Sequence, residues 1–363
     1  MLAAAFLTVN ALGCTPVRRV GPERESRPWP AHLLVPALAP SAAETLAAEP
    51  VRLWSAHAGR GFAGPPAIGD SVIAVQTTDA RLVALSRSTG KQIWQVRVDG
   101  LGASGPLLGP EAVYTATVNG QASATSLHTG RSIWKRTLQP LVGPLALDPK
   151  RLFTATASGR VYALDRGTGG IGWRHDLEAP LRSGPTLLLG RVVVATDDSI
   201  FQLDPGDGHR LGARAMHGVA LNPPAVWDTL LVYSSPDGFL AALNASDLTP
   251  VWKTNASEGF MGSAVVARDT VFAVSIGGTI WKVPLATPAA PVRIDLGVPV
   301  RAPPTPLADG LLVATIPGEI LRLTSSAEPS WKLRADAPLE QPPIVDRGSL
   351  IFLDGRGRIH AWR

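Results

Sequence analysis

Few side chains in this sequence have the type and spacing that catalysis or metal binding requires. The segment Asp-Pro-Gly-Asp-Gly-His at 204–209 contains acids and glycines, but its spacing differs from that of a calcium loop, and it predicts a hairpin turn. The histidines show no spacing typical of a metal site; they lie at positions 32, 57, 128, 175, 209, 217 and 360. No Gly-x-Ser-x-Gly elbow and no Gly-Lys-Ser/Thr phosphate loop occurs. The sequence therefore predicts no catalytic residue, metal ligand or cofactor-binding residue.

One glycine motif matches a nucleotide-binding pattern only in its letters. Residues 59–64, Gly-Arg-Gly-Phe-Ala-Gly, have the form Gly-x-Gly-x-x-Gly. Pro65 and Pro66 follow directly, where a phosphate-binding helix would have to begin. We expect a loop that connects two strands at this place.

Cys14 is the only cysteine of the chain, and it ends an apolar N-terminal run. Residues 11–14, Ala-Leu-Gly-Cys, resemble the bacterial lipobox, in which a signal peptidase cleaves before the cysteine and the thiol is lipidated. The match has two departures: leucine is more usual at Ala11, and no Lys or Arg precedes the apolar run. We predict a lipoprotein signal peptide over residues 1–13 and lipidation of Cys14. The alternative is a stray apolar segment with an incidental cysteine.

The next segment, residues 14–49, has the composition of a linker. It is rich in Pro, Ala and Arg, carries charges of both signs, and has no sustained hydrophobic period. A flexible chain of this length spans about 30 Å. We therefore predict a lipid anchor and flexible tether over 14–49, followed by a folded domain over 50–363.

Tryptophan recurs through the folded domain at intervals of 40, 40, 39, 79 and 79 residues; the positions are Trp54, Trp94, Trp134, Trp173, Trp252 and Trp331. Each long interval hides a copy without tryptophan, in which Ala213 or Arg293 takes its place. Every copy combines alternating apolar strands with Gly-containing turns. A strand-rich repeat of this length is typical of β-propeller blades. The sequence thus predicts an all-β, eight-bladed propeller of four-stranded blades.

The two ends of the repeat array complete each other. The last copy stops at Arg363, before the strand that carries the tryptophan signature, and the first copy begins with that strand at 50–56. Pairing the N-terminal strand with the C-terminal blade would cover two exposed sheet edges. We therefore expect the ring to close in this way.

Composition and charge agree with this fold and restrict the partners. The chain has 36 Gly and 33 Pro among 363 residues, as a protein with many turns requires. Its net charge is +5, which suits an anionic partner surface. No dense Lys/Arg run or basic helix is present, so we predict no nucleic-acid partner.

The repeat itself resembles a known family. Residues 152–173, LFTATASGRVYALDRGTGGIGW, resemble the PQQ-like repeat of quinoprotein-type propellers. Together with the lipobox and the tether, the eight copies resemble the BamB family of outer-membrane assembly lipoproteins. The resemblance implies tryptophans that pack between blades and a non-enzymatic scaffold without a cofactor. It also implies a monomeric subunit of a complex, lipid-anchored in the outer membrane and facing the periplasm. The implied partners are the barrel-assembly protein and unfolded barrel substrates.

The resemblance also suggests a partner-binding loop. The family contacts its barrel partner through a Leu-x-Leu-Arg loop, and the matching residues here place Leu181 and Arg182 on its second Leu and its Arg. Ala179 stands at the first Leu, and the family's acidic pair would fall near 218–226, where no carboxylate occurs. We expect Leu181 and Arg182 to bind a partner, because an exposed Leu beside an Arg suits a hot spot. The alternative is that Leu181 packs between blades and Arg182 is merely solvated.

Two other functions remain open from the sequence. One is a quinone-dependent dehydrogenase. These enzymes have a similar repeat, but they typically also have a disulfide between adjacent cysteines and a calcium site. The single cysteine of this chain cannot form that disulfide. The other is a generic periplasmic propeller that binds unrelated proteins.

Overall fold

A computed structural model describes residues 46, 50–216, 218, 222–256, 258–267, 269–288, 290–326 and 328–363. The predictions for the signal peptide, Cys14 and nearly all of the tether lie outside these residues. The described residues form β-strands and no α-helix, so this part of the chain offers no helix of the length and hydrophobicity that a membrane span needs.

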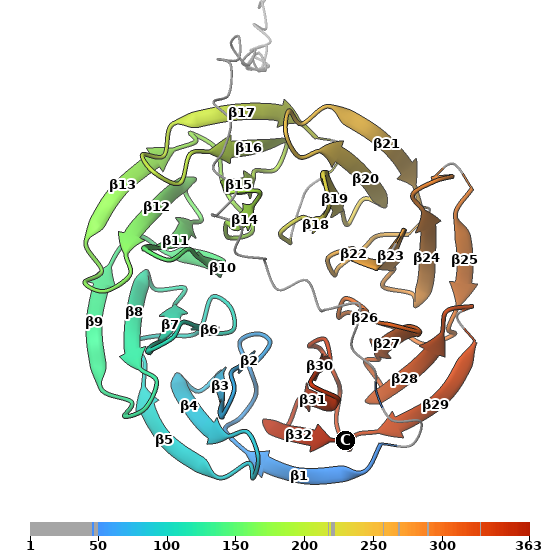
Figure 1. Ribbon diagram of the computed structural model, residues 1–363, viewed down its shortest axis with the longest axis horizontal. Coiled ribbons are helices and arrows are strands. Elements are labelled where there is room, and N and C mark those ends of the chain that lie inside the picture. The colour runs from blue at the N-terminus through green and yellow to red at the C-terminus, as the bar shows by residue number, and fades with distance from the viewer. Residues whose placement is uncertain are drawn as a thin grey trace, which may run out of the picture.

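The strands form eight four-stranded antiparallel sheets, arranged as the blades of a ring around a central axis (Figure 1). This architecture confirms the predicted eight-bladed propeller. Blades 1 to 4, each from its innermost strand outward, are β2 (Ala67–Ile68), β3 (Val72–Gln76), β4 (Arg81–Ser86) and β5 (Gln92–Arg97); β6 (Leu107–Leu108), β7 (Ala112–Ala116), β8 (Gln121–Ser126) and β9 (Ser132–Thr137); β10 (Leu141–Leu147), β11 (Arg151–Thr156), β12 (Arg160–Asp165) and β13 (Ile171–Asp176); and β14 (Thr186–Leu188), β15 (Arg191–Ala195), β16 (Ser199–Leu203) and β17 (Arg210–Ala215).

Blades 5 to 8 follow the same order. They are β18 (Ala225–Trp227), β19 (Leu230–Ser234), β20 (Phe239–Asn244) and β21 (Pro250–Asn255); β22 (Val265–Ala267), β23 (Thr270–Val274), β24 (Thr279–Pro284) and β25 (Val292–Asp295); β26 (Thr305–Leu307), β27 (Gly310–Ala314), β28 (Glu319–Thr324) and β29 (Pro329–Arg334); and β30 (Ile344–Asp346), β31 (Ser349–Leu353) and β32 (Arg358–Trp362), with β1 (Arg52–His57) as the outer strand.

Blade 8 closes the ring as the sequence predicts. Strand β1 pairs antiparallel with β32, from Arg52 opposite Trp362 to His57 opposite Arg358. Val51 N donates to Arg363 O at 2.7 Å, and Arg363 N donates back to Val51 O at 2.9 Å. The first strand of the domain thus lies at the rim, with the last strand next to it on the inner side (Figure 1).

Burial follows the position of a strand within its blade. The second strands β3, β7 and β15 are buried at every residue, because the neighbouring blades cover both of their faces. The outer strands instead alternate, and β5, β9 and β13 each bury only the tryptophan fully. Apolar clusters therefore lie between adjacent blades rather than in one central core.

Four tryptophans connect their blade to the next one. Each indole Nε1 donates to a carbonyl in the turn between the third and fourth strands of the following blade; the pairs are Trp54 to Arg87 O (3.0 Å), Trp94 to Leu127 O (2.8 Å), Trp134 to Arg166 O (2.9 Å) and Trp173 to Pro205 O (2.8 Å). The rings also pack on the turn glycines. A Cβ on Gly169, which has φ 69°, would lie 2.5 Å from Trp134 Cε3, so both the conformation and the close contact require glycine.

Trp252 and Trp331 are half-buried, and neither indole nitrogen has a hydrogen-bond partner among the described residues. The blade that follows each of them lacks the turn glycine on which the other tryptophans pack: the connection after β24 contains no glycine, and blade 8 is interrupted there by the chain ends. Leu46, just before the first strand, packs on the same apolar cluster as Trp331.

The structure corrects the slots assigned to the two copies without tryptophan. In regular blades the tryptophan pairs with an alanine of the third strand, as Trp173 does with Ala163. The corresponding pairs in blades 4 and 6 are Gln202 with Gly212 and Lys282 with Val292. The tryptophan slots are therefore Gly212 and Val292, one residue before Ala213 and Arg293. The sequence spacing missed this because the copies differ by one residue in length.

Candidate partner-binding face

The propeller presents two faces with different loops. One face, here called the loop face, consists of the loops between blades, such as 58–66, 98–106 and 177–185, and the hairpins between the second and third strands, such as 77–80, 117–120 and 354–357. Backbone hydrogen bonds join the two sets, for example Val98 N to Ala80 O at 3.0 Å and Ala335 N to Gly318 O at 2.7 Å. Residues 59–64 lie in one of these loops, as expected, and not at a helix.

Leu181 lies in the loop between blades 3 and 4, but its side chain is only 2 % exposed. It forms an isolated bridge with Thr196 and packs in the cluster that contains Trp173. The expectation of an exposed leucine is therefore wrong, and the packing alternative holds for this residue. The repeat carried the signal: the same position holds Leu141, Phe260, Val300 and Leu339 in other copies, each at most 2 % exposed.

Arg182, the next residue, points away from the core, with 56 % of its side chain exposed. Its Nε and Nη2 donate to the two carboxylate oxygens of Asp197 at 2.9 and 3.2 Å. This bidentate pair raises the pKa of Arg182, which is a cation at every relevant pH. The bridge between Leu181 and Thr196 places the two charged residues together. Sequence reasoning missed Asp197, although aligning each loop with the next hairpin would have found it.

Further charges surround this loop. Arg160 Nε donates to Asp176 Oδ2 at 3.0 Å, and Asp176 Oδ1 accepts from the Glu178 backbone N at 3.1 Å. The Arg160 guanidinium, followed by the Glu178 amide, lowers the pKa of Asp176. The region therefore presents fixed charges of both signs around Arg182. Whether this loop binds a partner stays a prediction.

On the opposite face, the turn at 204–209 brings Asp204, Asp207 and His209 within 4.8 Å of one another. The carboxylates already bind their own turn: Asp204 Oδ1 accepts from Gly206 N at 2.6 Å, and Asp207 Oδ1 accepts from His209 N at 3.0 Å. These contacts are those of a hairpin turn, as the sequence indicates. Among the described residues this is the one group of three such side chains.

The ring of eight four-stranded blades defines the chain as an eight-bladed β-propeller. A family model described as outer membrane protein assembly factor BamB matches residues 47–141, 118–227 and 203–287, which together span about two thirds of the chain. The chain therefore belongs to this family, and the resemblance seen in the repeats is confirmed. No curated protein matches the sequence significantly.

Solved structures with the same architecture have diverse functions. BamB from Moraxella catarrhalis is 18 % identical, with 83 % of each chain covered and a TM-score of 0.54. Quinohemoprotein alcohol dehydrogenase from Comamonas testosteroni is 13 % identical, with 86 % of this chain and 76 % of that chain covered and a TM-score of 0.70. Sqt1 from Saccharomyces cerevisiae is 10 % identical, with 84 % and 98 % covered and a TM-score of 0.72. At such identities the likeness is one of fold alone.

Proposed function

We propose that this chain is a non-enzymatic scaffold lipoprotein of outer-membrane β-barrel protein assembly. Cys14 would carry the lipid, residues 14–49 would form the tether, and the propeller would face the periplasm from the outer membrane as a monomeric subunit of a complex. The loop face would bind the barrel-assembly partner and hold unfolded barrel substrates near it, without a cofactor. The observation that carries this proposal is the match of the BamB family model to residues 47–287.

The geometry around Arg182 supports a role in docking. The loop backbone is held in place by buried Leu181, so the guanidinium extends from a rigid position. An ion pair as exposed as that with Asp197 contributes little to stability, so a partner carboxylate can replace Asp197 at small cost. The fork geometry of arginine then favours a carboxylate on the partner.

Substrates near the loop face could in addition pair with the rim of the propeller. The outer strand of each blade has a free edge, which can pair with an extended polypeptide by β-augmentation. Lysine or arginine normally protects such edges, as Lys135, Lys253 and Lys332 do in β9, β21 and β29. The interiors of β1 and β5 carry no charge, and they expose Leu53 (53 %) and Ile93 (47 %). We expect Leu53→Lys and Ile93→Lys to weaken binding of barrel-derived peptides, whereas peptides that never bind the wild type would refute this step.

The two alternatives make different predictions. A quinone-dependent dehydrogenase would develop a redox-active absorption spectrum on addition of pyrroloquinoline quinone and calcium. The dehydrogenases among the structural neighbours support only the shared fold. A generic periplasmic interaction protein would instead retrieve partners unrelated to barrel assembly.

The direct test is a crosslinking pull-down from membranes with the wild type, Arg182→Glu and Arg301→Glu. Arg301 is a matched control because it occupies the equivalent loop position before blade 7, is also 56 % exposed and pairs with Glu340. We leave Leu181 unchanged, since a charge at a buried position would unfold the blade.

The wild type and the Arg301 variant should retrieve the barrel-assembly complex, and the Arg182 variant should lose it. Retrieval of unrelated proteins by the wild type would refute the assembly role. Equal retrieval by all three would keep the role and remove Arg182 from the interface.

A further inference from the structure

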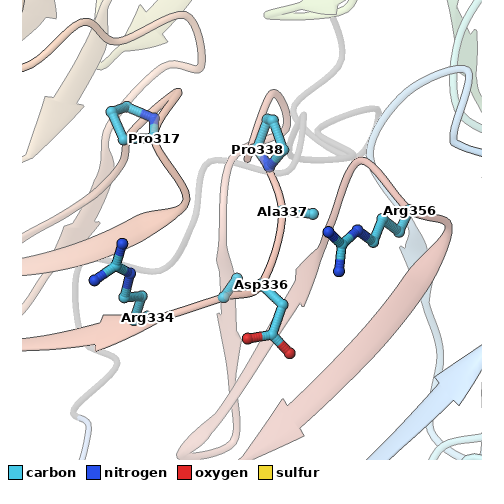
Figure 2. A pocket seen from close by; sticks show the side chains of 7 residues that line it. Pro317, Arg334, Asp336, Ala337, Pro338 and Arg356 are labelled. Carbon is cyan, nitrogen blue, oxygen red and sulfur yellow. The ribbon is translucent and has the colours of Figure 1, made fainter.

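A cavity of about 550 Å³ opens on the loop face between blades 7 and 8 (Figure 2). Its lining comes from three segments: the end of β29 with the loop behind it, the β27–β28 hairpin and the β31–β32 hairpin. The residues are Pro317, Arg334, Ala335, Asp336, Ala337, Pro338 and Arg356. Blades 7 and 8 lie across the ring from blades 3 and 4, whose connecting loop contains Arg182, so the cavity is a separate site (Figure 1).

The walls of this cavity are held rigidly by the backbone. Gly355 N donates to Pro338 O at 2.8 Å, which ties one hairpin to the loop, and Ala335 N donates to Gly318 O at 2.7 Å, which ties the other. Along this loop buried residues alternate with exposed ones: Ala335 and Ala337 are buried, whereas Asp336 and Pro338 are exposed.

The hairpin that carries Arg356 has an additional anchor. Asp354, 3 % exposed, accepts from Arg356 N at 2.9 Å and from Arg358 N at 3.0 Å through Oδ1. Its Oδ2 lies 2.9 Å from His360 Nε2, and the His360 ring stacks on Phe352 with centroids 4.7 Å apart. The backbone of Arg356 is therefore fixed by a buried carboxylate before any ligand binds.

Three charged side chains line the cavity, and none has a side-chain partner in the described part of the chain. Arg334 and Arg356 stand on either side of Asp336 in Figure 2. Among the described residues, none of the three forms an ion pair or a side-chain hydrogen bond, and Glu319, opposite Arg334 in the sheet, pairs with Lys332 instead.

Arg356 also departs from the repeat. The equivalent hairpin position in blades 1 to 7 holds Asp79, Asn119, Ser158, Asp198, Asp237, Gly277 and Pro317. These residue types favour turns, whereas arginine has no such preference. Because the hairpin carries arginine at this position, a second guanidinium lines the same cavity as Arg334. Turn formation does not explain it, but recognition of an anion does.

We propose that this cavity, the arginine cleft formed by Arg334, Asp336 and Arg356, binds a carboxylate of an extended polypeptide. Guanidinium groups match carboxylate and phosphate equally well in shape. The cleft carries only one net positive charge because Asp336 lies inside it, which favours a monoanion over a dianionic phosphate. Asp336 can accept a backbone N–H next to the bound acid, and Pro317 and Pro338 also line the cleft. The volume exceeds that of a lone acid group and suits a short peptide segment.

The test measures direct binding of small probes to the full chain, so its outcome does not depend on the proposed assembly role. Ligand-observed NMR titrations would follow acetyl-Ala-Asp-Ala-amide, its Asn counterpart and inorganic phosphate. We expect saturable binding of the Asp peptide, no binding of the Asn peptide, and an affinity loss of at least about tenfold in Arg334→Gln/Arg356→Gln, since each arginine supplies a charge-assisted hydrogen bond. Arg301→Gln, at an exposed arginine of the loop face that does not line the cavity, serves as the matched control and should bind normally. Thermal unfolding checks that each variant is folded.

Asp336→Asn separates the two anions. If Asp336 excludes dianions, this variant should bind phosphate more tightly than the wild type does. The proposal is overturned if binding of the Asp peptide is not saturable or if the double arginine variant binds this peptide as well as the wild type does. It is also overturned if the wild type binds phosphate more tightly than the Asp peptide.

Discussion

The interface between blades 3 and 4 and the interface between blades 4 and 5 are built from different residues. At the first, the Trp173 indole packs on the turn glycine Gly208 and donates to Pro205 O. At the second, the tryptophan slot is Gly212, and Leu248 occupies the turn position of the glycine with φ 60°. Leu248 is fully buried, and its Cδ1 would lie 3.9 Å from a Cβ on Gly212. The apolar volume thus comes from the opposite blade.

The hydrogen bond is replaced as well. At the second interface Gln202 Nε2 donates to Ala245 O at 2.5 Å, and this is the carbonyl that corresponds to Pro205 O. The blade 6 to 7 interface, which also lacks the tryptophan, uses Lys282 Nζ to Ser325 O at 2.8 Å. Both donors stand where regular blades have alanine. At these two interfaces without the tryptophan, another side chain therefore donates to the turn carbonyl, so this hydrogen bond does not depend on one residue type.

The largest effect is expected at a regular interface. Trp173→Ala removes the buried ring and leaves Pro205 O without its donor, so we expect a loss of about 3–5 kcal/mol of unfolding free energy. Trp252→Ala is the matched comparison, because its indole is half-buried and its Nε1 has no partner among the described residues. Urea unfolding monitored by circular dichroism measures both. Equal losses would contradict the importance of the interblade hydrogen bond.

At the alternative interface, Leu248→Gly should cost about 2–4 kcal/mol, since the cavity it leaves outweighs the relief of a strained φ. Gly212→Trp alone should also destabilise, because the new ring meets Leu248. Combining the two rebuilds the regular arrangement, and we expect the double variant to be more stable than the summed losses predict by about 1–3 kcal/mol. Simple additivity in a double-mutant cycle would show that the two positions do not share one volume.

Gln202→Leu tests the replaced hydrogen bond with little change in volume. We expect a loss of about 1–3 kcal/mol, because Ala245 O and the buried Arg191, which also contacts Gln202, lose a partner. The control is Gln95→Leu, at an exposed position of β5, which should leave thermal stability nearly unchanged. Unchanged stability of the Gln202→Leu variant would mean that water or another donor satisfies Ala245 O.

The smallest effect concerns the turns on which the tryptophans pack. Asp165 accepts from Thr168 Oγ1 and from the amides of Thr168 and Gly167, and these hydrogen bonds lower its pKa. Its stabilising effect is present above the ordinary aspartate pKa and is lost as pH falls through the lowered folded-state pKa. Asp165→Asn should cost under about 1 kcal/mol at neutral pH, because the site is exposed. In thermal unfolding at acid pH, the stability difference between the variant and the wild type should vanish. A difference that stays constant at every pH would argue against a role for the ionised Asp165 carboxylate. Asn244 naturally fills this position in the alternative interface.

Several features follow from local sequence. Hydrophobic alternation and Gly-containing turns repeat at a nearly constant interval, so the strands and the eight blades could be predicted without contacts between distant residues. The incomplete copies at the two ends also predicted the pairing of β1 with β32. Cys14 and the tether remain predictions.

The candidate sites could be predicted only in part. The loop containing Leu181 and Arg182 lies on the loop face, but the burial of Leu181 depends on the hairpin of the next blade. The slots at Gly212 and Val292 depend on strand register, which spacing alone misplaced by one residue.

By itself, the sequence determined the repeat, the number of blades and the way the ring closes, because these depend on short-range patterns that each copy carries. The tertiary structure alone decided which residues meet across blades. Gln202 with Ala245 O, Arg182 with Asp197, and Arg334 with Arg356 around one cavity are all juxtapositions of separate turns or blades. Their physical cause is the packing of one blade against the next, which no single copy of the repeat encodes.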